Sequence, residues 1–552
     1  MIAMPASSPV QRFLHWADTC PNDVFLRQPI NGQWQTLSFA QAADQCKRMA
    51  QGLRSMGLQP GDKVALLIKN CAEWILADLA MMMAGVISIP IYPTLTAHSI
   101  ESILVHSESK AIIAGKLDAF EKQKAGVPAH VRIIGMNAYN SKGDVQWEDL
   151  LAQHASIDEV FTWEQKAIIT IIYTSGTTGA PKGVMHSLHS IDTVIQTASA
   201  EIPLIQRPKL FSYLPLSHIA ERMGIEFNAL YNGGCISFAE SLDSFAENLA
   251  DTQPDIFFAV PRIWIKFREK ILQKLPQKKL NLFLSIPILN NLLRKKIKTS
   301  LGLSKAYFVV SAAAPLAKEV QEWYKKLGID ICQAYGMTED CVYAHFNRPG
   351  SNKFGTVGKP LSGLQVKFSD EKEIRVKSEG NMQGYYKEPA MTADMFDEEG
   401  YLKTGDIGEL DADGYLMITG RVKDQFKTDK GKYIAPAPIE TSMLTNHHLE
   451  QVCVVGTGIP QPIALVTLSD SGKMQQQEAL FAQLEADMQV LNKTLEKHER
   501  IEKIVILEKS WTVENGLLTP SLKVKRNELE KIYLPHYPMW YSKPTTIVRD
   551  NG

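Results

Sequence analysis

The 552-residue sequence lacks an excess of either charge, because 59 Lys and Arg residues face 60 Asp and Glu residues. A nucleic-acid-binding protein usually carries a basic surplus, so this balance predicts no nucleic-acid partner. The 7 cysteines form no C-x-x-C pair, so neither a zinc site nor a disulfide framework is indicated, and a reducing cytoplasm is favoured. The N-terminus has no basic segment followed by an apolar one, and no secretory signal is expected.

Long uninterrupted apolar runs are also absent. The most apolar stretch, 74–91, contains Asp78, Gly85 and Pro90, whereas a membrane-spanning helix needs about 20 predominantly apolar residues. The sequence therefore predicts no transmembrane helix. With 45% hydrophobic and 22% charged residues, the composition is that of a globular protein, and at about 100 to 200 residues per domain it predicts several folded units.

The N-terminal part alternates between helical and strand patterns. Ser38 and Gln41 form the pattern of a capping box, which predicts an amphipathic helix from Phe39 to about Gly57. The segments that follow are a strand, a helix and a strand: 63–68, 72–84 and 86–89. Strands that are apolar throughout are typical of parallel sheets covered on both faces, so we expect a layered, doubly wound α/β fold.

The C-terminal part has the pattern of a small α+β unit. A helical stripe of apolar residues at 480–495 precedes an apolar strand at 503–507. The stretch before residue 420 is rich in turn residues, and the stretch after 423 is strongly charged. These features predict a large domain, 1–421, and a smaller one, 422–552.

One loop has the composition of a phosphate-binding segment. The sequence IIYTSGTTGAPKG, 171–183, follows an apolar strand at 167–173. Its backbone N–H groups and hydroxyls can donate to phosphate oxygens, while a lysine adds positive charge. The spacing does not match G-x-x-x-x-G-K-[ST], which argues against a P-loop NTPase, and a flexible polar loop is the alternative. The predicted phosphate-binding residues are Thr174, Ser175, Gly176, Thr177, Thr178, Gly179 and Lys182.

Four further segments follow this loop along the chain. They are SYLPLSHIAER (212–222), QAYGMTE (333–339), the set from YLKTGD (401–406) through Gly420 and Arg421 to Ile439 and Glu440, and LLTPSLKVKR (517–526). Together with 171–183, they resemble the AMP-forming, adenylate-producing superfamily of acyl-CoA synthetases, luciferases and peptide-synthetase adenylation domains. Within it, the segments 259–264, 433–440 and 517–523 resemble long-chain fatty acyl-CoA synthetases.

The resemblance implies an adenylate-forming fold with a nucleotide site. It places the residues around the nucleotide as follows: Ala313, Ala314, Pro315 and Tyr335 at the adenine, Gly336 and Met337 beside them, Thr338 at the α-phosphate, Asp406 at the ribose hydroxyls and Arg421 next to Asp406. Glu339 is implied as the Mg²⁺ ligand, an oxygen donor suited to a hard cation. Ala312 departs from the glycine that the family often has there. Outside the resemblance, these residues are ordinary turn formers, core residues or helix starts.

The resemblance also implies two catalytic residues and a hinge. Lys523 would reach from the smaller domain to the carboxylate and α-phosphate during adenylation, and His218 would flank the entrance for the acyl carboxylate. Lys423 matches the hinge about which the smaller domain rotates before the thiol enters. The alternatives are a solvated basic strand edge for Lys523 and a structural role for His218.

The implied activity is an ATP-dependent fatty acid–CoA ligase that needs Mg²⁺. A fatty acid would be converted to an acyl-AMP with release of pyrophosphate, and CoA would then accept the acyl group without a catalytic cysteine. A ligase that delivers the acyl group to a carrier-protein thiol, and a catalytically silent lipid- or nucleotide-binding relative, are the alternatives. The acyl chain length, oligomeric state and fate of the product stay open.

A basic, apolar-rich segment is notable without any resemblance. Residues 262–305 contain 12 Lys or Arg and one acid, Glu269, interleaved with leucine, isoleucine and phenylalanine. Such a segment can lie on anionic lipid, where each cation contributes about 1 kcal/mol. We therefore expect reversible peripheral membrane association through 262–305, with a cytoplasmic protein at the inner face of a membrane. A helical hairpin with a basic solvent face and an apolar core face is the alternative.

Overall fold

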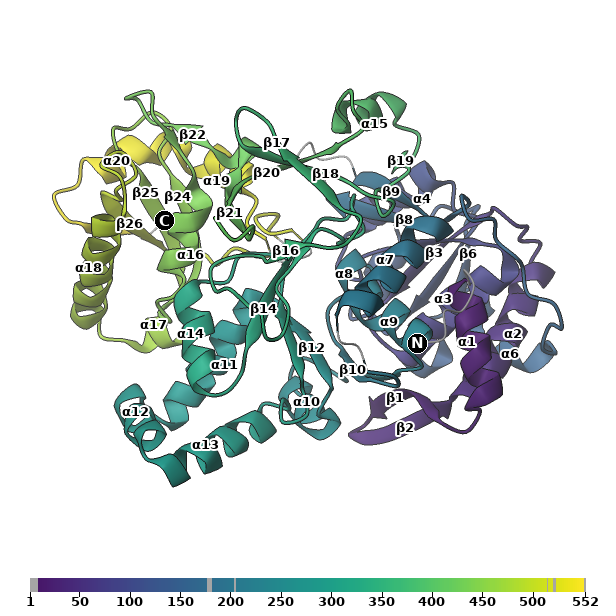
Figure 1. The fold of residues 1–552 in the computed structure, drawn as a ribbon. Coiled ribbons are helices and arrows are strands. Elements are labelled where there is room, and N and C mark those ends of the chain that lie inside the picture. Colours follow the sequence, from purple (N-terminus) through teal and green to yellow (C-terminus); the bar gives the residue numbers. More distant parts are fainter. Residues whose placement is uncertain (1–7, 176–180, 203–204, 514, 520–522, 551–552) are drawn as a thin grey trace.

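The computed structural model describes residues 8–175, 181–202, 205–513, 515–519 and 523–550 (Figure 1). The largest sheet has the strand order β19-β9-β8-β4-β3-β5-β6-β7. Its strands from β8 to β7 run parallel, whereas β8, β9 and β19 pair antiparallel. The bounds are β3 (Lys63–Ile68), β4 (Ile87–Pro90), β5 (Ala111–Gly115), β6 (Arg132–Gly135), β7 (Val145–Gln146), β8 (Ile168–Ser175), β9 (Pro181–Ser187) and β19 (Gly384–Tyr385).

The helices that accompany this sheet include the two predicted ones. The first, α2 (Phe39–Ser55), begins with the expected capping box: the Ser38 hydroxyl accepts from the Gln41 N–H, and the Gln41 side chain accepts from the Ser38 N–H. The next, α3 (Ala72–Ala84), is buried along its whole length, as an all-round apolar helix must be. The other helices of this region are α1 (Pro9–Thr19), α4 (Ala97–Ser107), α5 (Phe120–Lys124), α6 (Trp147–Gln153), α7 (Leu188–Glu201), α8 (Ile219–Glu221), α9 (Asn228–Asn232) and the short η1 (Asn137–Tyr139).

Three further sheets complete the larger part of the chain. Their strand orders are β10-β11-β1-β2, β12-β13-β14-β15-β16 and β17-β18-β20-β21. The strand bounds are β1 (Val24–Ile30), β2 (Gln33–Ser38), β10 (Lys209–Ser212), β11 (Cys235–Phe238), β12 (Ile256–Ala259), β13 (Phe308–Ser311), β14 (Ile331–Tyr335), β15 (His345–Phe346), β16 (Lys359–Pro360), β17 (Gln365–Phe368), β18 (Glu373–Lys377), β20 (Leu402–Leu410) and β21 (Leu416–Arg421). Helices α10 (Phe245–Thr252), α14 (Lys318–Lys326) and α15 (Pro389–Met395) lie between these strands in the chain.

The C-terminal part is a mixed α+β unit, as predicted. Its sheet has the order β24-β25-β26-β27, and its hydrophobic residues form two clusters of their own. The strands are β22 (Phe426–Lys427), β23 (Tyr433–Ile434), β24 (Leu449–Val455), β25 (Ile463–Leu468), β26 (Lys503–Leu507) and β27 (Ile547–Asp550). The helices are η3 (Val422–Asp424), α16 (Pro436–Met443), α17 (Asp470–Met474), α18 (Gln477–Thr494), α19 (Arg526–Tyr533), η4 (Leu534–His536) and α20 (Tyr537–Tyr541).

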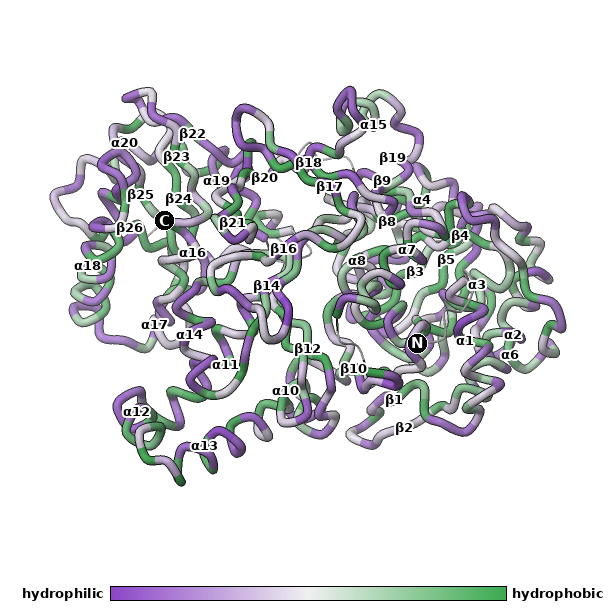
Figure 2. The backbone as a smooth tube through the Cα atoms, in the orientation of Figure 1, coloured by the Kyte–Doolittle hydropathy of each residue, from purple (hydrophilic) through white to green (hydrophobic). Residues whose placement is uncertain are grey.

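The basic segment 262–305 forms three helices, α11 (Pro261–Lys274), α12 (Gln277–Ser285) and α13 (Pro287–Ser300). In Figure 1, α12 and α13 project from the body at its lower left, whereas α11 lies beside α14 and near the C-terminal unit. Figure 2 shows hydrophobic and hydrophilic residues alternating along α12 and α13. Within the described ranges, no helix has the length and apolar character needed to cross a membrane.

Candidate active site

Asp406 lies at the centre of a three-residue contact. The antiparallel pairing of β20 and β21 sets Asp406 opposite Arg421, and the Arg421 Nε donates to Asp406 Oδ1 over 2.6 Å. The hydroxyl of Tyr335, at the end of β14, donates to the other carboxylate oxygen over 2.8 Å. Asp406 is buried, and its negative charge raises the pKa of Arg421. Three predicted site residues from different strands therefore meet at one carboxylate.

The backbone that follows Tyr335 folds back on itself. A Cβ on Gly336 would lie 2.5 Å from the Val342 Cα, so only glycine fits. Cys341 and Val342 have φ of 58° and 54°, a left-handed conformation that is costly for a β-branched residue. The Met337 N–H donates to the Asp340 carboxylate over 2.8 Å, and burial raises the Asp340 pKa to about 8. This turn holds Thr338 and Glu339 beside Tyr335.

Glu339 is a carboxylate with a single hydroxyl partner in the described structure. Its Oε1 accepts from the Tyr385 hydroxyl over 2.8 Å, and the Lys182 Nζ lies 5.5 Å from the centre of the Tyr385 ring. No group of three His, Cys, Asp or Glu residues suited to a metal occurs among the described residues. Mg²⁺ is commonly held by one or two carboxylates and substrate phosphates, and Glu339 fits that mode of binding.

The loop after β13 carries backbone strain where adenine contact is predicted. Ala313 has φ of 71°, a conformation in which a non-glycine residue costs about 1–2 kcal/mol. Ala314 and Pro315 follow it and are exposed, and the Leu316 N–H donates to the Gln333 side chain over 2.7 Å. Strained residues of this kind concentrate at functional sites, where the surrounding structure enforces them.

His218 ends a loop that buried polar groups hold in place. The Glu221 carboxylate accepts from the Ser212 hydroxyl and the Tyr213 N–H, each over 2.9 Å, and burial raises the Glu221 pKa to about 8. His218 Nδ1 accepts from the Ala220 N–H over 3.1 Å, which assigns the ring proton of the neutral form to Nε2. Burial and the nearby Lys523 lower the His218 pKa to about 4, so the ring is neutral at pH 7.

The helix after His218 is anchored by a buried arginine. Arg222 begins a π-helix, η2 (Arg222–Phe227), and its guanidinium bonds to Asp78 of α3 over 2.5 Å and to Glu226 over 3.0 Å. A third bond runs to the Thr170 hydroxyl on β8 over 2.8 Å. Because these side chains are fully buried, the network fixes the His218 segment against the main sheet.

Lys523 enters this region from the C-terminal unit. Its backbone carbonyl accepts from the Thr519 N–H over 2.8 Å, and the neighbouring Val524 pairs with Leu518. The side chain keeps contact with solvent. Desolvation by nearby protein atoms and the Arg421 charge lower the Lys523 pKa, whereas Asp406, Glu339 and Asp424 act in the opposite direction. Lys523 thus lies within the electrostatic reach of the predicted nucleotide-binding residues.

Other predicted residues have plainer settings. Thr174 on β8 pairs with Lys182 on β9, so these two flank the ends of the phosphate-binding segment. Residues Gly176, Thr177, Thr178 and Gly179, together with the Ser175 side chain, lie outside the described residues. Lys423 is exposed on η3, directly after β21.

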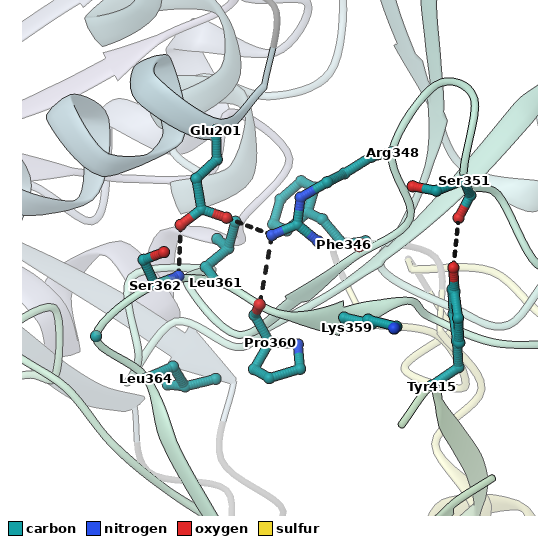
Figure 3. A pocket seen from close by; sticks show the side chains of 11 residues that line it. Glu201, Phe346, Arg348, Ser351, Lys359, Pro360, Leu361, Ser362, Leu364 and Tyr415 are labelled. Atoms are coloured by element: carbon teal, nitrogen blue, oxygen red, sulfur yellow. Dashed lines mark hydrogen bonds and ion pairs between the residues drawn. The ribbon is translucent and has the colours of Figure 1, made fainter. Parts of the chain in front are cut away.

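A separate cavity of ≈ 520 Å³ lies beside β16 (Figure 3). Its wall contains an ion pair between Glu201 and Arg348, and the Tyr415 hydroxyl donates to the Ser351 carbonyl over 2.9 Å. None of the predicted site residues is among its lining residues. The cavity is therefore distinct from the predicted nucleotide-binding residues.

The AMP-binding enzyme family matches residues 13–386, and its C-terminal domain matches residues 423–543. The chain belongs to the AMP-binding enzyme family. A long-chain-fatty-acid–CoA ligase of Mycobacterium bovis, FadD15, is 28% identical over 581 aligned residues, with 95% of each chain covered. The ligase ACSBG2 of Xenopus laevis is also 28% identical, over 95% of this chain and 82% of its own.

Solved structures place this AMP-binding enzyme in the adenylate-forming fold. The adenylation domain of a carboxylate reductase from Mycobacterium chelonae matches with a TM-score of 0.83 at 20% identity, covering 98% of this chain and 92% of that one. The o-succinylbenzoate CoA synthetase of Bacillus subtilis, solved with its acyl-adenylate, matches with a TM-score of 0.74 at 21% identity, covering 94% and 97%. The expected fold class is confirmed.

Sequence reasoning missed several contacts in this AMP-binding enzyme. Tyr385, the partner of Glu339, lies outside the quoted motifs. Glu440 and Arg526, two residues of the motifs with no predicted role, form an ion pair over 2.5 Å. Because Arg526 follows Lys523 by three residues, this ion pair ties the end of the lysine loop to α16. Tyr385 is distant in sequence from Glu339, so no local pattern indicates their contact. The opposite charges of Glu440 and Arg526 are a signal from which their ion pair could have been predicted.

Proposed function

We propose that this AMP-binding enzyme is an ATP-dependent fatty acid–CoA ligase that forms an acyl-AMP and then an acyl-CoA. The observation that carries the proposal is the position of Lys523, from the C-terminal unit, within electrostatic reach of Glu339, Asp406 and His218. The similarity to long-chain-fatty-acid–CoA ligases supports fatty acid and CoA as substrates. The proposed division into 1–421 and 422–552 is supported by the separate hydrophobic clusters of the C-terminal unit.

The first step requires positive charge near two anions. A carboxylate oxygen of the fatty acid bonds to the α-phosphorus of ATP, the bond from that phosphorus to the bridging oxygen breaks, and pyrophosphate leaves. The Lys523 ammonium offsets the charge of the carboxylate and α-phosphate as they approach. Glu339 is the residue that would hold Mg²⁺, which supplies further positive charge to the phosphates when bound. His218, neutral at pH 7, can orient the carboxylate by donating from Nε2.

Nucleotide binding is assigned to the surrounding residues. Asp406 would accept from the ribose hydroxyls, with Arg421 and Tyr335 holding its carboxylate. The strained loop of Ala313, Ala314 and Pro315 would lie against the adenine, with Gly336 and Met337 beside it, and Thr338 would donate to the α-phosphate. Residues 174–179 and Lys182 would surround the β- and γ-phosphates. Donors held in place before the substrate arrives need little reorganisation during the reaction.

The second step requires the CoA thiol to reach the acyl-AMP at the position that Lys523 occupies in the first step. The CoA sulfur bonds to the acyl carbon, the bond from that carbon to the AMP oxygen breaks, and the thiol proton passes to solvent. AMP is a good leaving group, so no enzyme nucleophile is needed. Rotation about Lys423 would withdraw Lys523 and admit the thiol.

The decisive assay measures AMP and acyl-CoA formation from Mg-ATP and fatty acids of short, medium and long chain, with and without CoA. Acyl-CoA formation that favours long chains is the expected result. Acyl-AMP that accumulates despite added CoA would point instead to a carrier-protein acceptor. Absence of adenylation with every acid would refute the proposal in favour of a silent relative.

Peripheral membrane association is proposed for the α12–α13 hairpin. Residues 270–318 contain no acidic side chain. Three apolar side chains near the hairpin turn are strongly exposed: Leu282 at 58%, Ile288 at 76% and Leu292 at 61%. Exposed apolar residues beside cations match an anionic lipid surface, into which long-chain fatty acids also partition. The enzyme would then act in the cytoplasm, at the inner face of a membrane.

Flotation with liposomes tests this association. The protein should float with vesicles containing anionic phospholipid at low salt, and less so with neutral vesicles. Ile288→Ser should reduce flotation, whereas Leu242→Ser, which changes a 91% exposed leucine outside the hairpin, should not. Failure of the unmodified protein to bind anionic vesicles at low salt would overturn the proposal.

A further inference from the structure

Two partly buried cations of α11 contact the C-terminal unit. Arg262 forms an ion pair with Glu450 at the start of β24, and Arg268 donates to the Thr445 carbonyl over 2.5 Å. Both partners lie in or next to the short connection from α16 to β24. Figure 1 shows α11 beside α14, on the side of the larger part that faces the C-terminal unit. These contacts link the two parts at a place distant in sequence from the hinge at Lys423.

Apolar residues of the larger part and of the C-terminal unit also face each other next to these polar contacts. A crevice of only ≈ 30 Å³ lies between the larger part and the C-terminal unit. The larger part lines it with Ile265, Leu316 and Val320, and the C-terminal unit lines it with Thr441 and Leu444. A space of this size has room for no substrate and for about one water molecule. The two surfaces therefore nearly touch, with the polar contacts of Arg262 and Arg268 alongside.

The contact is formed at a cost. Burial lowers the pKa of both Arg262 and Arg268, and the Nε atom of each is buried without a hydrogen-bond partner in the described structure. A buried donor without a partner loses free energy that water would restore on exposure. Desolvation of the two guanidinium groups therefore weakens the contact. A weakened contact of this kind suits an interface that forms and separates repeatedly.

In the same arrangement of the two parts, the charges of Glu339 and Asp406 act on Lys523, and the Lys523 charge acts on His218. We propose that the contacts of α11 with Thr445 and Glu450 form a latch that holds the C-terminal unit in its adenylating orientation and opens before thioester formation. The proposal rests on the two-step function proposed above. Arg262 and Arg268 are positioning residues in it, because they act through the placement of Lys523 and touch no substrate.

Charge reversal at Glu450 tests the latch. Glu450→Arg should slow acyl-AMP formation about fivefold, the upper range for a half-exposed ion pair, and leave thioester formation from preformed acyl-AMP equal or faster. Arg262→Glu should do the same, and the double variant Arg262→Glu/Glu450→Arg should recover adenylation. Glu478→Arg, the same charge change at an exposed acid of α18, is the matched control and should change neither step.

Hydrogen exchange provides a readout that does not depend on activity. Backbone amides of 261–274 and 444–450 should exchange faster in Glu450→Arg than in the unmodified protein, and the double variant should restore protection. Equal exchange in all of these proteins, or equal loss of both half-reactions in the single variants, would overturn the latch. An unmodified protein that forms no acyl-AMP would refute the proposed function instead, and the exchange experiment would still decide whether the contact exists.

Discussion

Replacing the lysine of the C-terminal loop separates the two half-reactions. In Lys523→Ala, the ammonium proposed to face the acyl carboxylate and α-phosphate is lost, while Glu339 and Asp406 keep their hydrogen bonds to Tyr385 and Arg421. Removal of one preorganised donor to a developing charge typically slows a reaction about 10²- to 10³-fold. We expect a loss of that size in acyl-AMP formation and little change in acyl-CoA formation from preformed acyl-AMP.

Pyrophosphate release in the absence of CoA measures the first step, and acyl-CoA formation from synthetic acyl-AMP measures the second. Lys525→Ala is the matched control, since it removes an ammonium two residues away on the same loop. The lowered pKa of Lys523 adds a pH signature: adenylation should decline as the pH rises through a value below that of an ordinary lysine, because the ammonium is lost there. Equal loss in both steps for Lys523→Ala would refute the role given to this residue.

Three other changes have defined outcomes. Asp406→Asn keeps the size but loses the charge that Arg421 and ribose hydroxyls use, so the KM for ATP should rise about tenfold, the size of a charged hydrogen bond, in a steady-state assay. Arg222→Met leaves two buried carboxylates without their cation and should lower the free energy of unfolding by roughly 3–5 kcal/mol, measured by denaturant titration; no change would contradict the buried network. Gly336→Ala sets a Cβ 2.5 Å from the Val342 Cα, so ATP binding measured by calorimetry should be lost or strongly weakened, and unaltered binding would contradict the account of this turn.

Local patterns predicted the elements whose formation depends on neighbouring residues. The strands β3 and β26 and the helix α3 have the expected bounds, and the capping box of α2 is present. In each case the burial pattern and the terminating residues lie within a few positions of one another. The order of strands in the main sheet, with β8 next to β4, has no such local signal because it is set by long-range packing.

Recognition of the site depended on separate segments that resemble one family. Their residues do meet at Asp406, although Tyr335, Asp406 and Arg421 come from three strands. The left-handed Ala313 and the partner of Glu339 were not predicted. An alanine has no residue-type preference for positive φ, so its strain becomes visible only in three dimensions. Tyr385 reaches Glu339 because β19 pairs with β9 at the edge of the main sheet. A strand of two residues has no sequence pattern from which this pairing could be predicted.

The basic segment shows why a local charge surplus does not identify its partner. The cations of 262–305 have different surroundings: Arg262 and Arg268 of α11 contact the C-terminal unit, whereas Lys295 and Lys296 of α13 are exposed. A count that adds all twelve therefore overstates the charge available to a lipid surface. The expected membrane contact rests on α12 and α13 alone, and charge reversals in α11 would disturb the adenylating orientation instead. Flotation with variants of the hairpin, and half-reaction assays with variants of α11, should consequently respond independently of each other.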